Sequence, residues 1–207
     1  MTRALSVREA TYARVMSRLS RYAGMRVFRI FHRPLESRTE ESVGGPEYRL
    51  LAEREVLALC ADASLGMTRP NVHAAYSRGD VCLGAFDASR LVGYCWFAFS
   101  PAPHMDSAWV EFPPDVVYTY KSYVVPACRG RGIAAALYRY PDRIWLRRCR
   151  TRAMLCVESH NFPSFAAAKR AGFSPTGYAA YFGASRLRAW RSGGVADCGM
   201  RFFAPAA

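Results

Sequence analysis

The chain has 207 residues, 51% of them hydrophobic and 14% aromatic, and its 29 basic against 16 acidic side chains give a formal net charge of +13. This composition is typical of a globular protein with a substantial core, and the longest apolar run, Leu91–Phe99, is too short to cross a bilayer. The N-terminus lacks the apolar core and cleavage site of a secretory signal, so we expect a cytoplasmic protein, with attachment to a membrane surface left open.

The cysteine and histidine pattern argues against a disulfide framework or a metal site. The seven cysteines are odd in number, contain no C-x-x-C, and mostly lie inside apolar segments, which is typical of reduced buried thiols. The histidines are too scattered to suggest metal ligands, at positions 32, 73, 104 and 160. We therefore expect no metal cofactor.

Residues 1–26 form a basic segment with the apolar spacing of an amphipathic helix that ends near Gly24. Between Arg3 and Arg33 there are eight arginines and one acid, Glu9, so this stretch contributes +7 of the net charge. Two interpretations stay open: the helix packs on the rest of the chain, or it docks on an acidic partner such as an anionic membrane or an acidic protein. Residues 27–207 are expected to form a single domain.

The first part of that domain alternates between strand and helix patterns. We expect a strand at Val27–Leu35, a loop over residues 36–46, a helix at Glu47–Ala61, a turn at Leu65–Pro70, a short helix at Asn71–Arg78, a hairpin of Val81–Asp87 and Leu91–Ser100 joined by Ala88–Arg90, an irregular loop at Pro101–Ser107, and a strand at Ala108–Phe112.

The stretch after Val116 is the most informative. β-branched and aromatic residues run to a break at Pro126, and Arg129, Gly130, Arg131 and Gly132 then lead into Ile133 and Ala134, which predicts strand, turn and helix. Glycines let the backbone approach a ligand closely, and the first helical amides lack intrahelical partners, so an anion such as phosphate fits there. Arg129 and Arg131 could add charge-assisted bonds to it.

The rest of the chain again alternates between helix and strand patterns. We expect the helix from Gly132 to about Arg150, interrupted at Pro141, then a strand at Ala153–Glu158, a helix from Pro163 to Ala171 stopped by Gly172, a closing hairpin of Tyr178–Phe182 and Arg186–Arg191, and a small-residue tail at 192–207.

Two blocks of the sequence resemble the GNAT superfamily of acyl-CoA-dependent N-acyltransferases. Arg129, Gly132 and Ala134 match its signature [Q/R]-x-x-G-x-[G/A], after a V-x-P-like segment at Tyr123–Pro126. The second block, residues 155–173, is similar to the next strand and helix of the family, and looser similarity extends from about residue 47 to 191. The resemblance implies a mixed α/β fold with a mostly antiparallel central sheet flanked by helices, here with an extra N-terminal helix.

The resemblance also implies where acyl-CoA binds. Backbone groups at Tyr123, Val124 and Val125 hold the pantetheine, which lies between the central strand and Ala153–Glu158, and one amide there donates to the oxyanion. The pyrophosphate contacts the amides of residues 130–134, and Asn161 and Ser164 of the second block add further contacts. Residues near 62–76 contact the acceptor. The full set of expected CoA contacts is Tyr123, Val124, Val125, Arg129, Gly130, Arg131, Gly132, Ile133, Ala134, Asn161 and Ser164.

The catalytic groups are less determined, because the sequence departs from the family pattern. Many members protonate the leaving thiolate with a tyrosine seven residues after the position of Asn161, but this chain has Ala168 there. Many place Glu or His where this chain has Tyr118, and a neutral tyrosine is a poor base. The catalytic candidates are Glu158, Glu111, His160 and Tyr118, although Tyr118, like Tyr120, is expected to shape the pocket more than to titrate.

These observations predict an N-acyltransferase, most simply an N-acetyltransferase, that moves an acyl group from acyl-CoA to a primary amine by direct attack in a ternary complex. The amine could belong to a small molecule or a protein. The alternatives are an enzyme that takes long-chain acyl groups from acyl carrier protein and, from another class, a basic nucleic-acid-binding module, which lacks a recognisable reading motif. Neither the acceptor nor the oligomeric state follows from the sequence.

Overall fold

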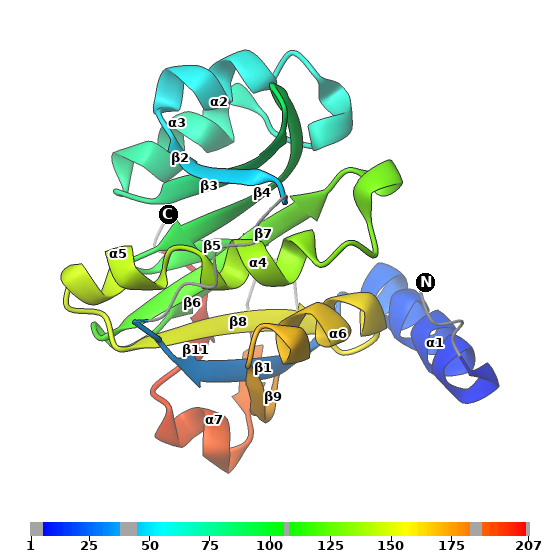
Figure 1. Ribbon diagram of the computed structural model, residues 1–207. Coiled ribbons are helices and arrows are strands. Elements are labelled where there is room, and N and C mark those ends of the chain that lie inside the picture. The colour runs from blue at the N-terminus through cyan, green and yellow to red at the C-terminus, as the bar shows by residue number, and fades with distance from the viewer. Residues whose placement is uncertain (1–5, 38–44, 106–107, 183–187, 206–207) are drawn as a thin grey trace. The chain divides into compact units, whose positions relative to one another are not determined.

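The computed structural model describes residues 6–37, 45–105, 108–182 and 188–205 (Figure 1). Its helices are α1 (Val7–Ala23), α2 (Glu53–Leu59), α3 (Arg69–Ser77), α4 (Ile133–Arg139), α5 (Asp142–Arg147), α6 (Phe162–Arg170) and α7 (Gly193–Asp197), with short 3₁₀ turns at Ala63–Leu65 and Pro126–Cys128. Its strands are β1 (Arg26–Pro34), β2 (Glu47–Leu51), β3 (Val81–Asp87), β4 (Arg90–Ala98), β5 (Ala102–Met105), β6 (Ala108–Glu111), β7 (Val116–Val124), β8 (Arg152–Glu158), β9 (Ser174–Phe182), β10 (Arg188–Arg191) and β11 (Arg201–Phe203).

The chain divides into two compact units, each made of discontinuous segments. The first unit comprises Met1–Arg33, Pro101–Pro113 and Met154–Ala207, and the second comprises Pro34–Ser100 and Pro114–Ala153. The second unit contains the glycine-rich turn that the sequence singled out.

In the second unit, strands pair antiparallel in the order β2-β3-β4-β7. The helix expected at Glu47–Ala61 is wrong over its first third, because Glu47–Leu51 forms β2 and pairs with β3. α2 begins only after Ala52, whose backbone amide donates to the Glu55 side chain at 2.8 Å. That capping contact marks the helix start, while the residues before it gain sheet hydrogen bonds instead.

Helices cover both faces of this sheet. Tyr94 and Trp96 of β4 belong to the core that includes Val56 of α2 and Val72 of α3. Neighbouring residues of a strand point to opposite faces, and a Cβ on Gly93 would lie 3.3 Å from Ile133 and 3.4 Å from Leu137 of α4. The absence of a side chain at Gly93 therefore lets α4 pack directly on β4.

The first unit contains strands in the order β10-β9-β1-β8 and a smaller antiparallel sheet in the order β11-β6-β5. Phe28 of β1 is fully buried and packs on Tyr181 of β9, His104 of β5 and Phe202 of β11, with ring centroids 4.5–5.6 Å apart. This aromatic cluster joins the two sheets of the first unit.

Two further expectations are wrong in this unit. The irregular loop expected at Pro101–Ser107 is wrong over Ala102–Met105, which forms β5 and pairs with β6, and residues 106–107 lie outside the described residues. The expected tail at 192–207 contains α7 and β11, and β11 pairs with β6 on the edge that β5 leaves open. Val195, Met200 and Phe202 are buried there, so tertiary packing orders a segment whose many small residues give little local signal.

Other expected elements are confirmed. A capping box between Ser6 and Glu9 starts α1, and Gly24 ends it in a left-handed conformation. α4 and α5 are separated at Pro141, and α3 begins at Arg69, two residues before its expected start. The closing hairpin pairs β9 with β10, although β9 starts earlier than expected, at Ser174, and residues 183–187 lie outside the described chain.

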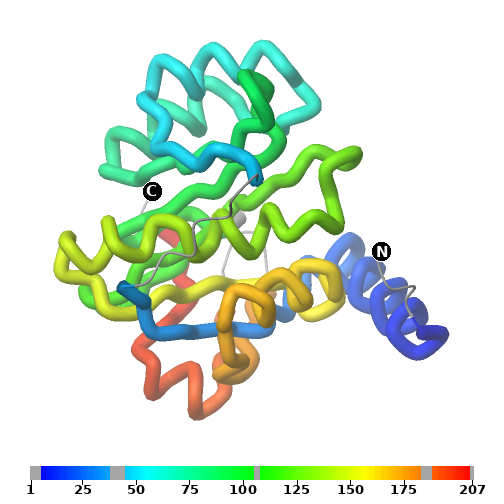
Figure 2. The backbone as a smooth tube through the Cα atoms, in the orientation of Figure 1, coloured from blue at the N-terminus to red at the C-terminus, as the bar shows by residue number. Residues whose placement is uncertain are grey.

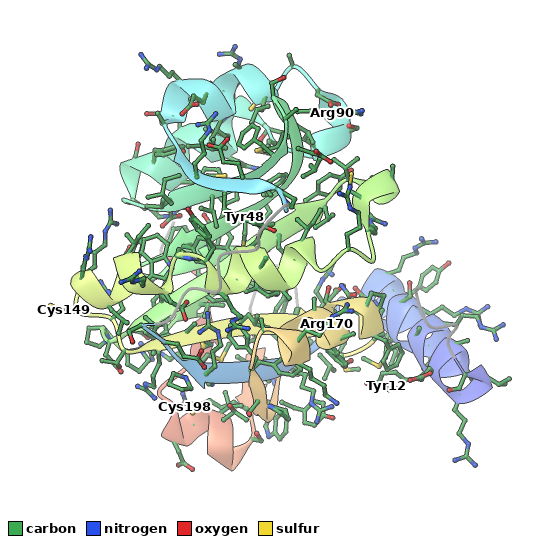
Figure 3. The ribbon with its side chains drawn as sticks, viewed as in Figure 1. Tyr12, Tyr48, Arg90, Cys149, Arg170 and Cys198 are labelled. Carbon is green, nitrogen blue, oxygen red and sulfur yellow. The ribbon has the colours of Figure 1, made fainter. Side chains whose placement is uncertain are left out.

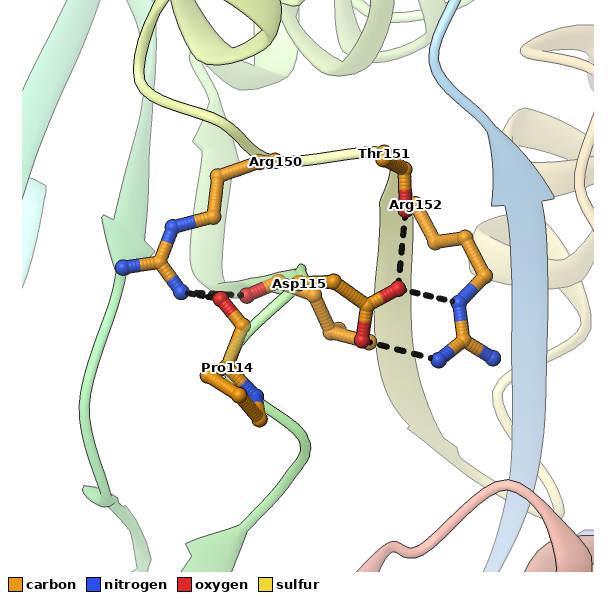
Figure 4. Close-up of polar contacts among 6 residues, drawn as sticks. Pro114, Asp115, Arg150, Thr151 and Arg152 are labelled. Atoms are coloured by element: carbon orange, nitrogen blue, oxygen red, sulfur yellow. Dashed lines mark hydrogen bonds and ion pairs between the residues drawn. The ribbon is translucent and has the colours of Figure 1, made fainter.

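A group of polar contacts holds the start of β7 in the second unit (Figure 4). Arg152 donates to both carboxylate oxygens of Asp115, at 2.9 and 3.0 Å, and the Thr151 hydroxyl donates to one of them at 2.8 Å. Arg150 donates to the carbonyl of Pro114. The hydrogen bonds from Arg152, more than any other contact, lower the pKa of Asp115 to about 2, so this carboxylate stays charged and keeps the start of the central strand in place.

Candidate active site

A β-bulge interrupts β7 shortly before the glycine-rich turn. Tyr120 pairs with Trp96 and Tyr123 pairs with Tyr94, so two residues of β7 lie opposite one residue of β4. Lys121, the first of the two, has φ of 45°, a left-handed conformation that lysine rarely adopts. Bulges bend a strand and redirect its side chains, and backbone strain of this kind is concentrated at functional sites.

The turn after β7 has the conformation that its glycines permit. Figure 2 traces the chain as it leaves β7, passes through Pro126–Cys128 and enters α4. Gly130 and Gly132 have φ of 81° and 82°, and a Cβ on either would meet no atom within 4 Å. No side chain caps α4 at Gly132. The space beside both glycines is therefore open within the described chain, and the first amides of α4 keep their capacity to bind an anion.

The two arginines of the turn bind back onto the second unit. The Arg129 Nε donates to the carbonyl of Val124 at 3.1 Å, and its guanidinium lies 6.0 Å from the centre of the Tyr123 ring. Arg131 forms an exposed ion pair with Asp87 at 3.4 Å. Arg129 therefore links the turn to its own strand, and both guanidinium groups keep further donors for an anion.

The hydrogen bonds of β7 distinguish among the three backbone positions expected to hold pantetheine. The Val125 amide donates to the carbonyl of Val92 on β4 at 3.0 Å, so it is already used. Successive amides of a strand point to opposite edges, which directs the Val124 amide to the edge of β7 away from β4. The Val124 amide is therefore the better placed of these two for a ligand on that edge.

The remaining expected CoA contacts lie in the first unit, at the start of α6. The Asn161 side chain accepts a hydrogen bond from the Ser164 amide at 3.2 Å and so caps the helix. Ala168, where many GNAT members carry the tyrosine, is fully buried on the same helix. A hydroxyl is thus absent from this position, and its place is filled by packed atoms.

The carboxylate and imidazole of Glu158 and His160 lie together in the first unit, with Arg26 beside them. Arg26 donates to Glu158 at 2.7 Å, and the His160 Nε2 lies 3.7 Å from the other carboxylate oxygen. Both carboxylate oxygens of Glu158 therefore face a basic side chain of the first unit. Glu158 is therefore tied to the start of β1.

The other two candidates for the base have different surroundings. Glu111, at the end of β6, forms an ion pair with Arg201 of β11 in the first unit. Tyr118 of β7 is fully buried and stacks on Tyr120 with ring centroids 5.7 Å apart. Glu111 and Tyr118 are therefore in different units of the chain.

A buried charged group that sequence reasoning did not single out lies in the second unit. Asp80 is 2% exposed, and its Oδ2 accepts hydrogen bonds from Tyr120 and from Arg78, both at 2.6 Å. Asp80 directly precedes β3, after Gly79, and resembles an ordinary turn aspartate in the sequence. One sequence feature pointed toward Asp80, the aromatic run of β7. That run contains Tyr120, which was expected to shape the pocket.

In the described ranges, from residue 6 to 205 with three gaps, no three His, Cys, Asp or Glu side chains are grouped so as to hold a metal ion. Within the same ranges, no helix is both long and apolar enough to span a bilayer.

Comparison with known structures finds the same fold in acetyltransferases. A protein from Novosphingobium aromaticivorans assigned to the GNAT family is 18% identical, with a TM-score of 0.51, over 82% of this chain and 68% of that one. A GCN5-related N-acetyltransferase from Sphaerobacter thermophilus is 17% identical, with a TM-score of 0.54, over 88% of this chain and 56% of that one. A GCN5-related N-acetyltransferase from Kribbella flavida is 14% identical, with a TM-score of 0.51, over 86% and 64%. This chain thus spans between about half and two thirds of their lengths, and at these identities the likeness concerns the fold.

The sequence itself gives the family. A comparison with curated proteins yields no match. The family model described as "Acetyltransferase (GNAT) family" matches residues 50–173, which is more than half of the chain and includes β7, the glycine-rich turn, α4, β8 and α6. The expected mixed α/β fold, with its mostly antiparallel sheet, flanking helices and extra α1, is confirmed. The chain belongs to the GNAT acetyltransferase family.

Proposed function

We propose that the protein is an N-acyltransferase, most simply an N-acetyltransferase, that takes its acyl group from acyl-CoA and passes it to a primary amine. The observation that carries this proposal is the family match over residues 50–173, which contains the turn at Arg129–Ala134. The left-handed glycines and the open space beside them support a pyrophosphate contact there. The acceptor belongs to a small molecule or to a protein side chain.

The reaction we propose is a direct attack in a ternary complex. The amine nitrogen bonds to the thioester carbonyl carbon, the carbon–sulfur bond breaks, and a proton passes from the nitrogen to the departing sulfur. The Val124 amide is our choice for the donor to the developing oxyanion, because the Val125 amide is used by β4. Since Ala168 offers no acid, the thiolate leaves without a proton from that position.

The test of CoA binding compares two glycine variants with the same backbone strain. Gly132→Glu places a carboxylate where the phosphates bind, and Gly172→Glu places one at a left-handed glycine in the first unit. By calorimetry we expect CoA affinity to be lost in Gly132→Glu and kept in Gly172→Glu, with both proteins folded. Unchanged affinity in folded Gly132→Glu would contradict the proposed cofactor site.

The donor and the class of function are tested separately. Thiol release from acetyl-CoA with a panel of primary amines measures the proposed activity, and the same assay with long-chain acyl carrier protein tests the alternative donor. A nucleic-acid-binding module would instead bind duplex DNA with an affinity that falls steeply as salt increases. DNA binding without CoA binding would overturn the enzyme proposal.

We also propose that α1 docks the protein on an anionic membrane surface. Val7, Val15 and Tyr22 are 82%, 50% and 80% exposed, and Met16 is the one described residue of α1 that is buried. Four arginines of the helix are also exposed, at positions 8, 14, 18 and 21. Exposed apolar side chains beside arginines suit the boundary between anionic headgroups and acyl chains.

The contacts that α1 makes with the first unit leave this surface available. The Tyr12 hydroxyl donates to Ser159 at 2.8 Å, and its ring centroid lies 6.5 Å from that of Phe162 at the start of α6. Figure 3 shows Tyr12 on the side of α1 toward α6. The helix is therefore anchored through one side, and we assign its exposed side to the membrane surface, with acyl carrier protein as the competing partner to be tested.

A further inference from the structure

Asp80 is a buried carboxylate with unequal oxygens. Its Oδ2 accepts hydrogen bonds from the Tyr120 hydroxyl and the Arg78 guanidinium, each at 2.6 Å. Its Oδ1 is buried and has no hydrogen-bond partner among the described residues. A carboxylate oxygen removed from water without a partner is costly for the charged form, and a proton would relieve that cost.

Three tyrosines of the core shared with α2 and α3, Tyr76, Tyr94 and Tyr120, use their hydroxyl groups differently. Tyr76 donates to the Leu51 carbonyl at 2.8 Å and Tyr94 donates to the Leu65 carbonyl at 2.6 Å. Those main-chain acceptors cannot take up a proton. The Tyr120 hydroxyl instead donates to a carboxylate, so of these three tyrosines Tyr120 alone can pass its proton to its partner.

Tyr120 lies next to the bulge that redirects β7. It precedes the left-handed Lys121 and is three residues before Tyr123, at most about 10 Å along an extended strand. Its ring packs against the core shared with α2 and α3, 6.4 Å from the centroid of Trp96. The residue therefore connects the end of β7 that leads into the CoA turn with the helices expected to contact the acceptor.

We propose that Tyr120 and Asp80 form a proton relay that deprotonates the acceptor amine. This inference rests on the proposed function. Before the attack, one N–H bond of the protonated amine breaks and an O–H bond forms at Tyr120, while the hydroxyl proton of Tyr120 moves to the Asp80 carboxylate. The neutral nitrogen then bonds to the thioester carbon, the carbon–sulfur bond breaks, and the second proton of the nitrogen passes to the departing sulfur. Tyr120 is the catalytic residue, since it meets the amine, and Asp80 acts through it. The charge balances, because the first proton ends on Asp80 and the second ends on the CoA thiol.

The electrostatics of the pair agree with these roles. Burial is the largest influence on Asp80 and raises its pKa, although hydrogen bonds from Tyr120 and the charge of Arg78 lower it in part. Burial and the neighbouring carboxylate raise the pKa of Tyr120 far above its ordinary value. Tyr120 is therefore neutral before the reaction and transmits a proton, while Asp80 is a better proton store than an exposed aspartate.

The same surroundings indicate the class of acceptor. Tyr76 and Tyr120 are only partly buried, and both pack on Trp96, with ring centroids 5.4 and 6.4 Å from it. Aromatic faces attract a protonated amine before it gives up its proton. The inference therefore favours a cationic primary amine over one that arrives neutral.

The experiment compares Asp80→Asn and Tyr120→Phe with the controls Asp197→Asn and Tyr178→Phe, which change exposed residues of the first unit. Melting temperature and CoA affinity establish that each variant is folded and binds the cofactor. Turnover is then measured with acetyl-CoA and methylamine, 2-phenylethylamine, spermidine or a lysine-containing peptide, using the amine that the wild type acetylates fastest. We expect kcat to fall on the order of 100-fold in both relay variants and to stay within twofold in the controls.

The pH profile separates a relay from a merely structural role. An amine that is already deprotonated needs no base, so the loss in Asp80→Asn should shrink as pH approaches the amine pKa, about 10 for an alkylamine. A loss that is equal at every pH, or normal turnover in either folded variant, would overturn the relay and leave the proposed function intact. Failure of wild-type protein to bind CoA, or to acetylate any of the four amines, would overturn both.

Discussion

Arg26 and Glu158 form an ion pair at 2.7 Å that joins the start of β1 to the end of β8 in the first unit. Both side chains are about one-third exposed, so the pair is partly screened by water. Its geometry uses one oxygen of the carboxylate that the sequence proposed as a base. Because that oxygen already accepts a hydrogen bond from Arg26, the ion pair favours a structural interpretation of Glu158 over a catalytic one.

The paired variants Glu158→Gln and Arg26→Gln decide between those interpretations. If the ion pair is structural, each should lower the free energy of unfolding by at most about 1 kcal/mol and leave turnover within a few-fold. Denaturant unfolding and thiol release measure the two effects. A loss of kcat above tenfold in Glu158→Gln, without a similar loss in Arg26→Gln, would return the role of base to Glu158.

Ala168→Tyr tests whether the family's tyrosine can be restored. Ala168 is fully buried, so we expect the larger side chain to overpack α6 and to cost about 1–3 kcal/mol of stability without accelerating turnover. Ala166→Tyr, at an exposed position of the same helix, is the control and should change little. A folded Ala168→Tyr protein that is more than tenfold faster would show that thiolate protonation limits the wild type.

If α1 docks on a membrane, the loss of vesicle binding should depend on which arginines are replaced. Replacing its four exposed arginines by glutamine should weaken binding to phosphatidylserine-containing vesicles at least tenfold, since each basic residue near an anionic surface is worth about 1 kcal/mol. A control with Arg143, Arg147, Arg170 and Arg188 replaced by glutamine changes the net charge equally, and these residues are exposed elsewhere. Sedimentation with vesicles measures both.

Equal weakening in the two sets would mean that total charge, not α1, determines binding. Val7→Ser with Val15→Ser removes exposed apolar groups without altering charge and should also weaken the vesicle interaction. A different result would reassign α1 to acyl carrier protein. In that case the protein binds acyl carrier protein tightly, loses this binding when the α1 arginines are replaced, and binds anionic vesicles no better than neutral vesicles.

His104 should make the first unit sensitive to acid. Burial lowers its pKa from 6.5 to about 3, so the folded chain keeps this imidazole neutral. Between those pH values the unfolded chain binds a proton that the folded chain does not. Stability is therefore complete above pH 6.5 and decreases as pH falls toward 3, by about 2 kcal/mol at pH 5.

His104→Phe keeps a ring against Phe28 and Phe202 and removes the titration. Unfolding free energies at pH 7 and pH 5 should differ by about 2 kcal/mol less in this variant than in the wild type. Because both proteins are measured at the same two pH values, the contributions of the other titrating groups to the pH dependence cancel. One of these groups is Asp80, whose raised pKa makes stability increase as pH falls. An unchanged pH dependence would show that His104 is not the responsible group.

The elements that sequence predicted correctly are those whose signals are local. Pro126, the glycines and the β-branched run define β7, the turn and α4 without reference to distant residues. β2 was assigned to a helix because Leu50 and Leu51 fit both periodicities, and its strand form depends on pairing with β3, more than 30 residues away. The single domain predicted for residues 27–207 stays a prediction.

The two parts of the candidate site, the glycine-rich turn and Asp80 with Tyr120, differ in how far the sequence predicts them. The CoA turn has a fixed spacing that a single sequence displays. Asp80 gives no such signal, because its partner Tyr120 is 40 residues away and its burial depends on β3, β4 and β7 assembling first. The position of a carboxylate buried in this way depends on packing, which residue spacing does not encode.

The arginine-rich exterior of α1 has a consequence for a protein that handles activated acyl groups. Of the 29 basic residues in the chain, Lys121 and Lys169 are the only lysines. A lysine amine can be acylated and then loses its charge, whereas a guanidinium stays protonated and is no nucleophile at physiological pH. By carrying its positive charge on arginine, the chain offers few targets for self-modification, and the proposed attraction of α1 to anionic surfaces would survive exposure to acyl-CoA.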